Sequence, residues 1–168
     1  MVAQPSATPD PDNQWHDFVL GLLTDGECWV DDISVIQSPT NNPIQLISNG
    51  NFENGLTGWR VLGNHQRSML ETDPDNAGNH VLHVIASGPQ EHMNNHVETT
   101  LGRSVTNGVL YEISYRARWI SGNHLLNTRL YFNRVAHTTA LSVPQLNGTP
   151  GAVNSCYATN IGPTFAQF

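Results

Sequence analysis

The stretch GVLYEISYRARW (108–119) alternates apolar and mostly polar side chains along its whole length. Because successive side chains of a β-strand point to opposite faces of the sheet, this period of two predicts a half-buried strand. We expect the buried face to hold Val109, Tyr111, Ile113, Tyr115 and Ala117. We expect the exposed face to hold Leu110, Glu112, Ser114, Arg116 and Arg118.

The following run, LLNTRLYFNR (125–134), repeats the period of two. Its inward side is expected to hold Leu126, Thr128, Leu130 and Phe132, and its outward side Leu125, Asn127, Arg129, Tyr131 and Asn133. Strands that follow each other along the chain usually lie side by side in a sheet. The outward faces of the two strands would then form one polar surface, made of Arg116, Arg118, Arg129, Tyr131 and Asn133.

Short strand-like runs flank this pair on both sides. The segment WHDFVLGLLTDGECWVDDISVIQ (15–37) predicts two strands around a turn at Thr24-Asp25-Gly26, because DG is a strong turn signal. Further runs occupy 44–48, 58–63, 68–72, 80–87, 96–101 and 137–143. Gly, Asn or Pro separate them and no helical period appears, so we expect an all-β, jelly-roll β-sandwich.

Composition excludes several classes of partner. Charged residues make up 12% of the 168 residues, the formal net charge is -7, and all seven basic residues are Arg. A chain this acidic is a poor match for nucleic acid or for an anionic membrane surface. No apolar run approaches the roughly 18 residues of a membrane span, so no membrane insertion is expected. Cys28 and Cys156 lie far apart, and a disulfide between them stays open.

The chain divides into five segments. Residues 1–14 are polar and Pro-rich and predict a disordered leader. Residues 15–37 predict a closing β-hairpin, residues 38–43 a linker, and residues 44–143 the main jelly roll. Residues 144–168 predict a linker or tail.

The run LISNGNFENGLTGW (46–59) resembles the opening of jelly-roll carbohydrate-binding modules of the xylan- and glucan-binding group, which have galactose-binding-like folds. The likeness continues through GNHVLHVIASG (78–88) and VTNGVLYEISYRARW (105–119), in family order. The resemblance implies a non-catalytic module that binds polysaccharide, with Trp59 as a core residue. It also implies an extracellular or cell-surface setting, whose signal would lie outside this chain.

A second stretch resembles the same family, but its position along the chain differs from the family order. The run GECWVDDISVI (26–36) resembles the last strand of such a module, yet it precedes the opening motif. Residues 15–37 would then either end a preceding, truncated module or be the permuted last strands of this one. We favour the truncated tandem, because the leader and the tail both look like cut or linker sequence. The sequence also resembles tandems of such modules in large bacterial extracellular proteins with spore-coat-kinase-like and lamin-tail-like domains.

The resemblance also implies a structural Ca2+ ion, bound by Glu53 of the opening motif and Asp31 of the closing pair. Hard carboxylate oxygens suit such an ion. The alternative is that Asp31 and Asp32 are solvated or cap a strand, and that Glu53 is a turn residue.

Sugar binding by a sheet face uses aromatic rings against the pyranose and planar donors such as Arg and Asn for the hydroxyls. Arg116, Arg118, Arg129, Tyr131 and Asn133 fit that role. The alternative is an ordinary polar face, in which case the chain would be a structural spacer without glycan binding. A hydrolase would need two converging carboxylates, and neither GxSxG nor HExxH nor a phosphate loop is present. We therefore expect no enzyme activity.

Overall fold

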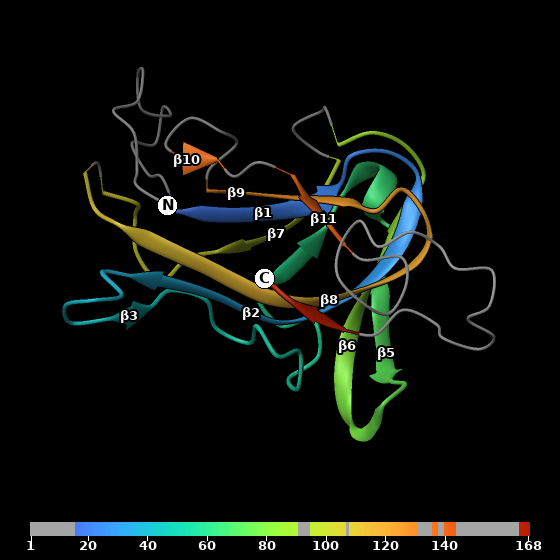
Figure 1. Ribbon diagram of the computed structural model, residues 1–168, viewed down its shortest axis with the longest axis horizontal. Coiled ribbons are helices and arrows are strands. Elements are labelled where there is room, and N and C mark those ends of the chain that lie inside the picture. Colours follow the sequence, from blue (N-terminus) through green and yellow to red (C-terminus); the bar gives the residue numbers. More distant parts are fainter. Residues whose placement is uncertain (1–15, 91–94, 107, 131–135, 138–139, 144–164) are drawn as a thin grey trace, which may run out of the picture.

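The computed structural model describes residues 16–90, 95–106, 108–130, 136–137, 140–143 and 165–168, and these form two packed antiparallel sheets (Figure 1). The β1 sheet has the order β10 (Ala136–His137), β9 (Leu125–Leu130), β1 (Asp17–Leu22), β7 (Val97–Thr100) and β4 (Trp59–Val61), and β11 (Leu141–Ser142) also pairs with β9. The β2 sheet has the order β12 (Ala166–Gln167), β8 (Tyr111–Gly122), β2 (Gly26–Gln37), β6 (Asn76–Ala86) and β5 (Met69–Asp73), and β3 (Ile44–Gln45) also pairs with β2. A short 3-10 turn, η1 (Gly63–His65), interrupts the strands. The predicted all-β jelly-roll sandwich is confirmed.

The core lies between the two sheets, and the predicted strand faces supply it. On β8, Tyr111, Tyr115 and Ala117 are buried, and Ile113 packs against the same cluster. On β9, Leu126, Thr128 and Leu130 are buried as expected, while Phe132 lies outside the described residues. The alternation of apolar and polar residues therefore orients both strands correctly.

The first two strands differ from the predicted hairpin. β1 and β2 do not pair with each other, because β1 lies between β9 and β7, whereas β2 lies between β8 and β6 in the other sheet. The Asp25-Gly26 turn is thus a corner that carries the chain from one sheet to the other. Both strands are central, so residues 17–37 belong to the same sandwich as the strands that follow.

Close backbone packing explains why this corner needs glycine. A second corner, at Gly122, carries the chain from β8 to β9, and it lies directly against the first. A Cβ at Gly26 would lie 2.5 Å from the backbone nitrogen of Asn123, and one at Gly122 would lie 2.7 Å from the carbonyl oxygen of Asp25. Gly122 also has a φ of 66°, a conformation that glycine adopts without strain. The glycine after Asp25 therefore allows two corners to touch rather than closing a hairpin.

The segments predicted as linkers are described in part. The predicted leader, residues 1–14, lies outside the described residues, as does most of 144–168. The end of the predicted tail is not a free connector, because Ala166 and Gln167 form β12 against β8. The ring of Phe168 stacks on that of Tyr115, with centroids 5.3 Å apart. Cys28 is a free thiol buried in the core, and Cys156 lies outside the described residues.

The opening motif at 46–59 folds into a loop that is organised by Asn49. Its side-chain amide donates to the carbonyl oxygens of Gly55 and Thr57, at 2.9 and 3.1 Å. The indole nitrogen of Trp59 donates to the carbonyl oxygen of Asn49 at 2.9 Å, and the Trp59 side chain is buried in the core. The expectation that Trp59 is a core residue is therefore confirmed.

Candidate functional site

The structure separates the residues predicted to form one binding surface. Arg116 and Arg118 lie on β8 in the β2 sheet, whereas Arg129 lies on β9 in the β1 sheet. The expectation that these consecutive strands are neighbours is wrong, because the corner at Gly122 moves the chain to the opposite layer. Tyr131 and Asn133 lie outside the described residues. The two outer faces of the sandwich therefore have to be considered one at a time.

The outer face of the β1 sheet carries a row of residues across four strands, polar on β9, β7 and β4 and apolar on β1, where Val19 is buried. Val19 on β1 is opposite Arg129 on β9 and Glu98 on β7, and Glu98 is in turn opposite Arg60 on β4. Side chains of directly opposite residues lie on the same face of a sheet. Neighbouring strands are about 4.8 Å apart, so this row, Arg129–Val19–Glu98–Arg60, extends for roughly 14 Å.

Two of the three charged residues in this row, Arg60 and Glu98, form an ion pair, whose carboxylate is buried. The Nη2 atom of Arg60 lies 2.6 Å from Oε1 of Glu98, and Nε2 of His96 lies 2.7 Å from Oε2 of the same carboxylate. Burial lowers the pKa of the Arg129 guanidinium. Burial, and then the charge of Glu98, raise the pKa of the neighbouring Asp17.

The buried side chain of Gln90 covers one end of this face. Gln90 is 2% exposed, and its Oε1 accepts hydrogen bonds from Nδ2 of Asn127 at 3.1 Å and Nη2 of Arg129 at 3.4 Å. It packs over Gly21, where a Cβ would approach Nε2 of both Gln90 and His65 to 2.9 Å. In the part of the chain that the structure describes, Nε2 of Gln90 and Nε of Arg129 have no hydrogen-bond partner. Both of these nitrogen atoms are buried, so the packing of Gln90 against Arg129 shields them from solvent.

Side chains on the outer face of the β2 sheet contact one another. The Arg118 guanidinium stacks 5.2 Å from the Trp29 ring centroid and its Nη1 contacts Oδ2 of Asp75 at 3.1 Å. The indole nitrogen of Trp29 donates to Glu71 at 2.8 Å, and the two ring nitrogens of His83 contact Glu71 and Glu27 at 2.8 and 3.0 Å. Trp29 is thus held by Arg118 and Glu71 of this chain, and its side chain remains partly exposed.

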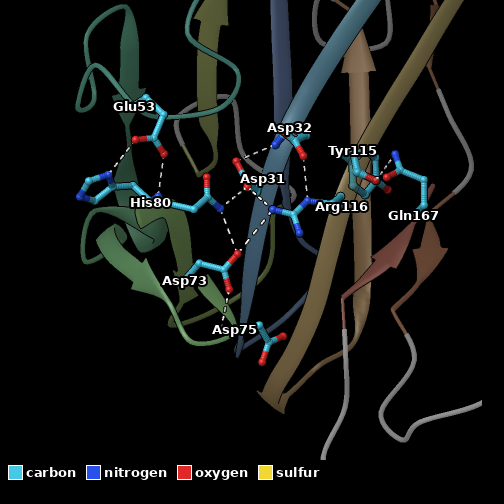
Figure 2. Close-up of polar contacts among 10 residues, drawn as sticks. Asp31, Asp32, Glu53, Asp73, Asp75, His80, Tyr115, Arg116 and Gln167 are labelled. Atoms are coloured by element: carbon cyan, nitrogen blue, oxygen red, sulfur yellow. Dashed lines mark hydrogen bonds and ion pairs between the residues drawn. The ribbon is translucent and has the colours of Figure 1, made fainter. Parts of the chain in front are cut away.

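Arg116 is the centre of a separate cluster of carboxylates (Figure 2). Its Nη2 donates to Oδ2 of Asp31 and lies 3.5 Å from Oδ2 of Asp73, and its Nε donates to Oδ2 of Asp32 at 2.8 Å. Nδ2 of Asn79 donates to the same oxygens of Asp31 and Asp73, at 2.9 and 3.0 Å. Asp31 is fully buried, whereas the Arg116 side chain is 29% exposed.

A β-bulge allows two consecutive carboxylates to reach one guanidinium. Successive side chains of a regular strand point to opposite faces, so Asp31 and Asp32 would ordinarily diverge. The pairing of β2 with β8 shifts register between Asp31 and Ser34, and Asp32 adopts a φ of 51°. Asp tolerates this left-handed conformation better than most residues do. The Asp-Asp pair in the sequence therefore marks a bulge that faces Arg116.

The two residues implied as calcium ligands do not contact each other. Both oxygens of Glu53 are bonded to His80, through its backbone nitrogen at 2.7 Å and its Nδ1 at 3.1 Å. Figure 2 shows Glu53 beside His80 and apart from the Asp31 carboxylate, which faces Arg116. Asn79 also donates to Asp31, at 2.9 Å. Among the described residues, no group of three or more His, Cys, Asp or Glu side chains is arranged to hold a metal ion. This donor arrangement does not fit a calcium ion shared by Asp31 and Glu53.

The sequence interpretation missed several residues of both clusters. Asn79 and Asp73 join the Arg116 cluster only because the β5–β6 turn folds next to β2 and β8, and no sequence spacing signals that. Glu98 could have been found, because it and His96 are the polar alternates of the predicted strand at 96–101. Gln90 lies in a Pro-flanked loop with no periodic signal.

A comparison with protein families matches residues 45–134 to the model of a carbohydrate binding domain. The match begins at β3 and includes the Arg129 position, while β1 and β2 lie before it. No curated protein and no solved structure matches the chain significantly. Over the described residues, no helix has the length and apolar character needed to cross a membrane.

Proposed function

Because this chain belongs to the carbohydrate binding domain family, we propose that it is a non-catalytic module that binds a polysaccharide on the outer face of the β1 sheet. The observation that favours this face is the set of polar side chains on three of its strands, Arg129 on β9, Glu98 on β7 and Arg60 on β4, of which the two arginines reach solvent. The Arg129 guanidinium is already held by Gln90, so binding a sugar hydroxyl would require little further ordering of this side chain.

Arg129 is the proposed principal ligand residue. Its planar guanidinium presents several donors in a fixed geometry, and Gln90 already holds one edge of it at 3.4 Å. Tyr131 and Asn133 have the same parity as Arg129 in the sequence and stay predicted ligands on this side. Arg116 and Arg118 are removed from the proposed ligand set, because both pair with carboxylates on the opposite sheet and Arg118 also stacks on Trp29.

The proposed setting is an extracellular, multidomain protein in which this module is joined to neighbouring domains. The central positions of β1 and β2 support the interpretation that they are the permuted last strands of this module rather than the end of a preceding one. Tandem modules and additional domains remain compatible with this arrangement.

The proposal is tested by affinity electrophoresis through gels that contain xylan, β-glucan, galactan, mannan or no polysaccharide. Wild-type protein should be retarded by at least one polymer. Arg129→Ala should lose that retardation, whereas Arg118→Ala should keep it, because Arg118 lies on the opposite sheet. Circular dichroism verifies that each variant is folded.

Two results would overturn the proposal. Retardation that is lost in Arg118→Ala and kept in Arg129→Ala would place the ligand on the β2 sheet. Migration of folded wild-type protein that is unchanged across a broad polymer panel would favour a structural spacer instead.

A further inference from the structure

We propose that Arg116 takes the place of a bound cation in this module, so that its guanidinium, without a metal ion, compensates Asp31, Asp32 and Asp73 and joins β2, β5 and β8. The inference goes beyond carbohydrate binding, because it concerns how the sandwich is held together on the sheet opposite the proposed glycan surface. Figure 2 shows the three carboxylates directed toward this one side chain.

The buried carboxylate of Asp31 requires a positive partner. Asp31 has no exposed surface, and an unpaired buried charge costs several kcal/mol. Burial raises the pKa of this carboxyl group, against the opposing effect of its hydrogen bonds with Asn79, the Asp32 backbone and Arg116. Arg116 is directly opposite Asp31 in the register of β2 and β8, so the pairing of these strands places the guanidinium next to the carboxylate.

The acceptor atoms are already used by nitrogen donors. Oδ1 of Asp31 accepts from the backbone nitrogen of Asp32 at 2.7 Å, and Oδ2 accepts from Arg116 and Asn79. A divalent cation bound to Asp31 would have to displace these donors and would lie next to the positive charge of Arg116, where repulsion opposes it. Arg suits the position, because its fork can bond several carboxylates at once.

The cluster connects elements that are far apart in the sequence. Asp31 and Asp32 belong to β2, Asp73 ends β5, and Arg116 belongs to β8. Asn79 on β6 bonds both Asp31 and Asp73, so the β5–β6 hairpin is attached to the same centre. The ring of Phe165 lies 4.7 Å from the guanidinium carbon and adds a cation–π contact from the C-terminal segment.

The first test needs no variant. Thermal unfolding of the wild-type protein is measured in excess calcium chloride and in excess EGTA. We expect the two melting temperatures to agree within about 1 °C, because a ligand that does not bind the native state cannot stabilise it. A melting temperature that rises by several degrees in calcium and falls in EGTA would overturn the proposal.

The second test compares two arginines on the same face of β8. Removing one partner of a buried ion pair is strongly destabilising, so Arg116→Gln should lower the melting temperature by on the order of 10 °C. Arg118→Gln is the matched control, because its carboxylate partner Asp75 is 60% exposed, and it should lose only about 3 °C or less. Equal losses in the two variants would contradict the special role of Arg116.

A double variant separates charge compensation from packing. If Arg116 acts by compensating charge, Asp31→Asn should recover part of the melting temperature lost in Arg116→Gln, because the uncompensated carboxylate is then removed. A double variant that is no more stable than Arg116→Gln alone would show that the side chain acts by packing, and the proposal would fail.

Discussion

The side chains of Arg60 and Glu98 form an ion pair between neighbouring strands β4 and β7, but they differ sharply in exposure. Their nitrogen and oxygen atoms are 2.6 Å apart, yet the Arg60 side chain is 60% exposed and that of Glu98 only 5%. Glu98 has a second partner in the buried His96, at 2.7 Å. The pair is thus anchored from the carboxylate side and is solvated on the guanidinium side.

This asymmetry predicts unequal costs for two conservative substitutions. Glu98→Gln should lower the free energy of unfolding by about 2 kcal/mol, because it weakens charge-assisted hydrogen bonds with both partners in a buried position. Arg60→Gln should cost less than about 1 kcal/mol, because an exposed partner is easily replaced by water. Urea denaturation of the two variants measures the difference, and a larger loss for Arg60→Gln would refute this account of the pair.

Gly50, the first glycine of the opening motif, is predicted to be irreplaceable. A Cβ at Gly50 would lie 1.9 Å from the carbonyl oxygen of Ile33, whose backbone nitrogen donates to Gly50 O at 2.9 Å. Because the obstacle is backbone rather than a flexible side chain, Gly50→Ala should cost more than about 3 kcal/mol.

Gly78 provides the matched control for this substitution. Its Cβ would lie 3.6 Å from Asn76 Oδ1, an ordinary contact, and its side-chain position is exposed. Gly78→Ala should therefore change stability by less than about 1 kcal/mol in chemical denaturation. If both variants lose the same amount, the contact between the opening loop and β2 is not what fixes Gly50.

The buried position of His65 leads us to expect that the protein loses stability in mild acid. Its Nε2 accepts a hydrogen bond from the backbone nitrogen of Leu22 at 3.1 Å, so this ring nitrogen carries no proton in the folded protein. Burial, and then the nearby His96, lower the pKa of His65 from 6.5 to about 4. Between these values the unfolded chain binds a proton that the folded chain does not, so stability falls as pH decreases from about 6.5 to about 4. The loss should approach about 3 kcal/mol.

A histidine variant isolates this contribution. His65→Gln should have a flatter stability profile than wild type over the same pH range, even if it is less stable at neutral pH. His124→Gln is the control, because the His124 side chain is partly exposed and its Nδ1 lies 2.8 Å from the Ser142 hydroxyl. Denaturation at a series of pH values checks this, and a wild-type slope retained in His65→Gln would exclude His65 as its source.

The alternation of residues predicts which way strands face but not which strands are neighbours. Tyr111, Tyr115 and Leu130 are buried as their parity indicates. From the sequence, the corners at Asp25-Gly26 and Gly122 look like hairpin turns. A short glycine turn has the same local signal whether the chain reverses or crosses to the other sheet. Only the packing of one corner on the other distinguishes these cases, and that contact joins residues about a hundred positions apart.

The candidate sites show the same limit. Parity correctly placed Arg129 and Asn127 on the side of β9 that faces away from the core, but Asn127 is buried because Gln90 covers it. Asp31 and Arg116 were each singled out, in different roles. Their pairing depends on a register that a bulge changes, and sequence periodicity does not report a bulge.

The most direct test of the central claim is to map which face of the sandwich meets a sugar. Amide chemical-shift changes are recorded while soluble oligosaccharides of xylan, β-glucan, galactan and mannan are titrated into the isotopically labelled chain. The account predicts saturable shifts for at least one series, concentrated on β9, β1, β7 and β4 around Arg129, Val19 and Glu98. Shifts concentrated on β8, β2 and β6, or no shifts with any series, would contradict it.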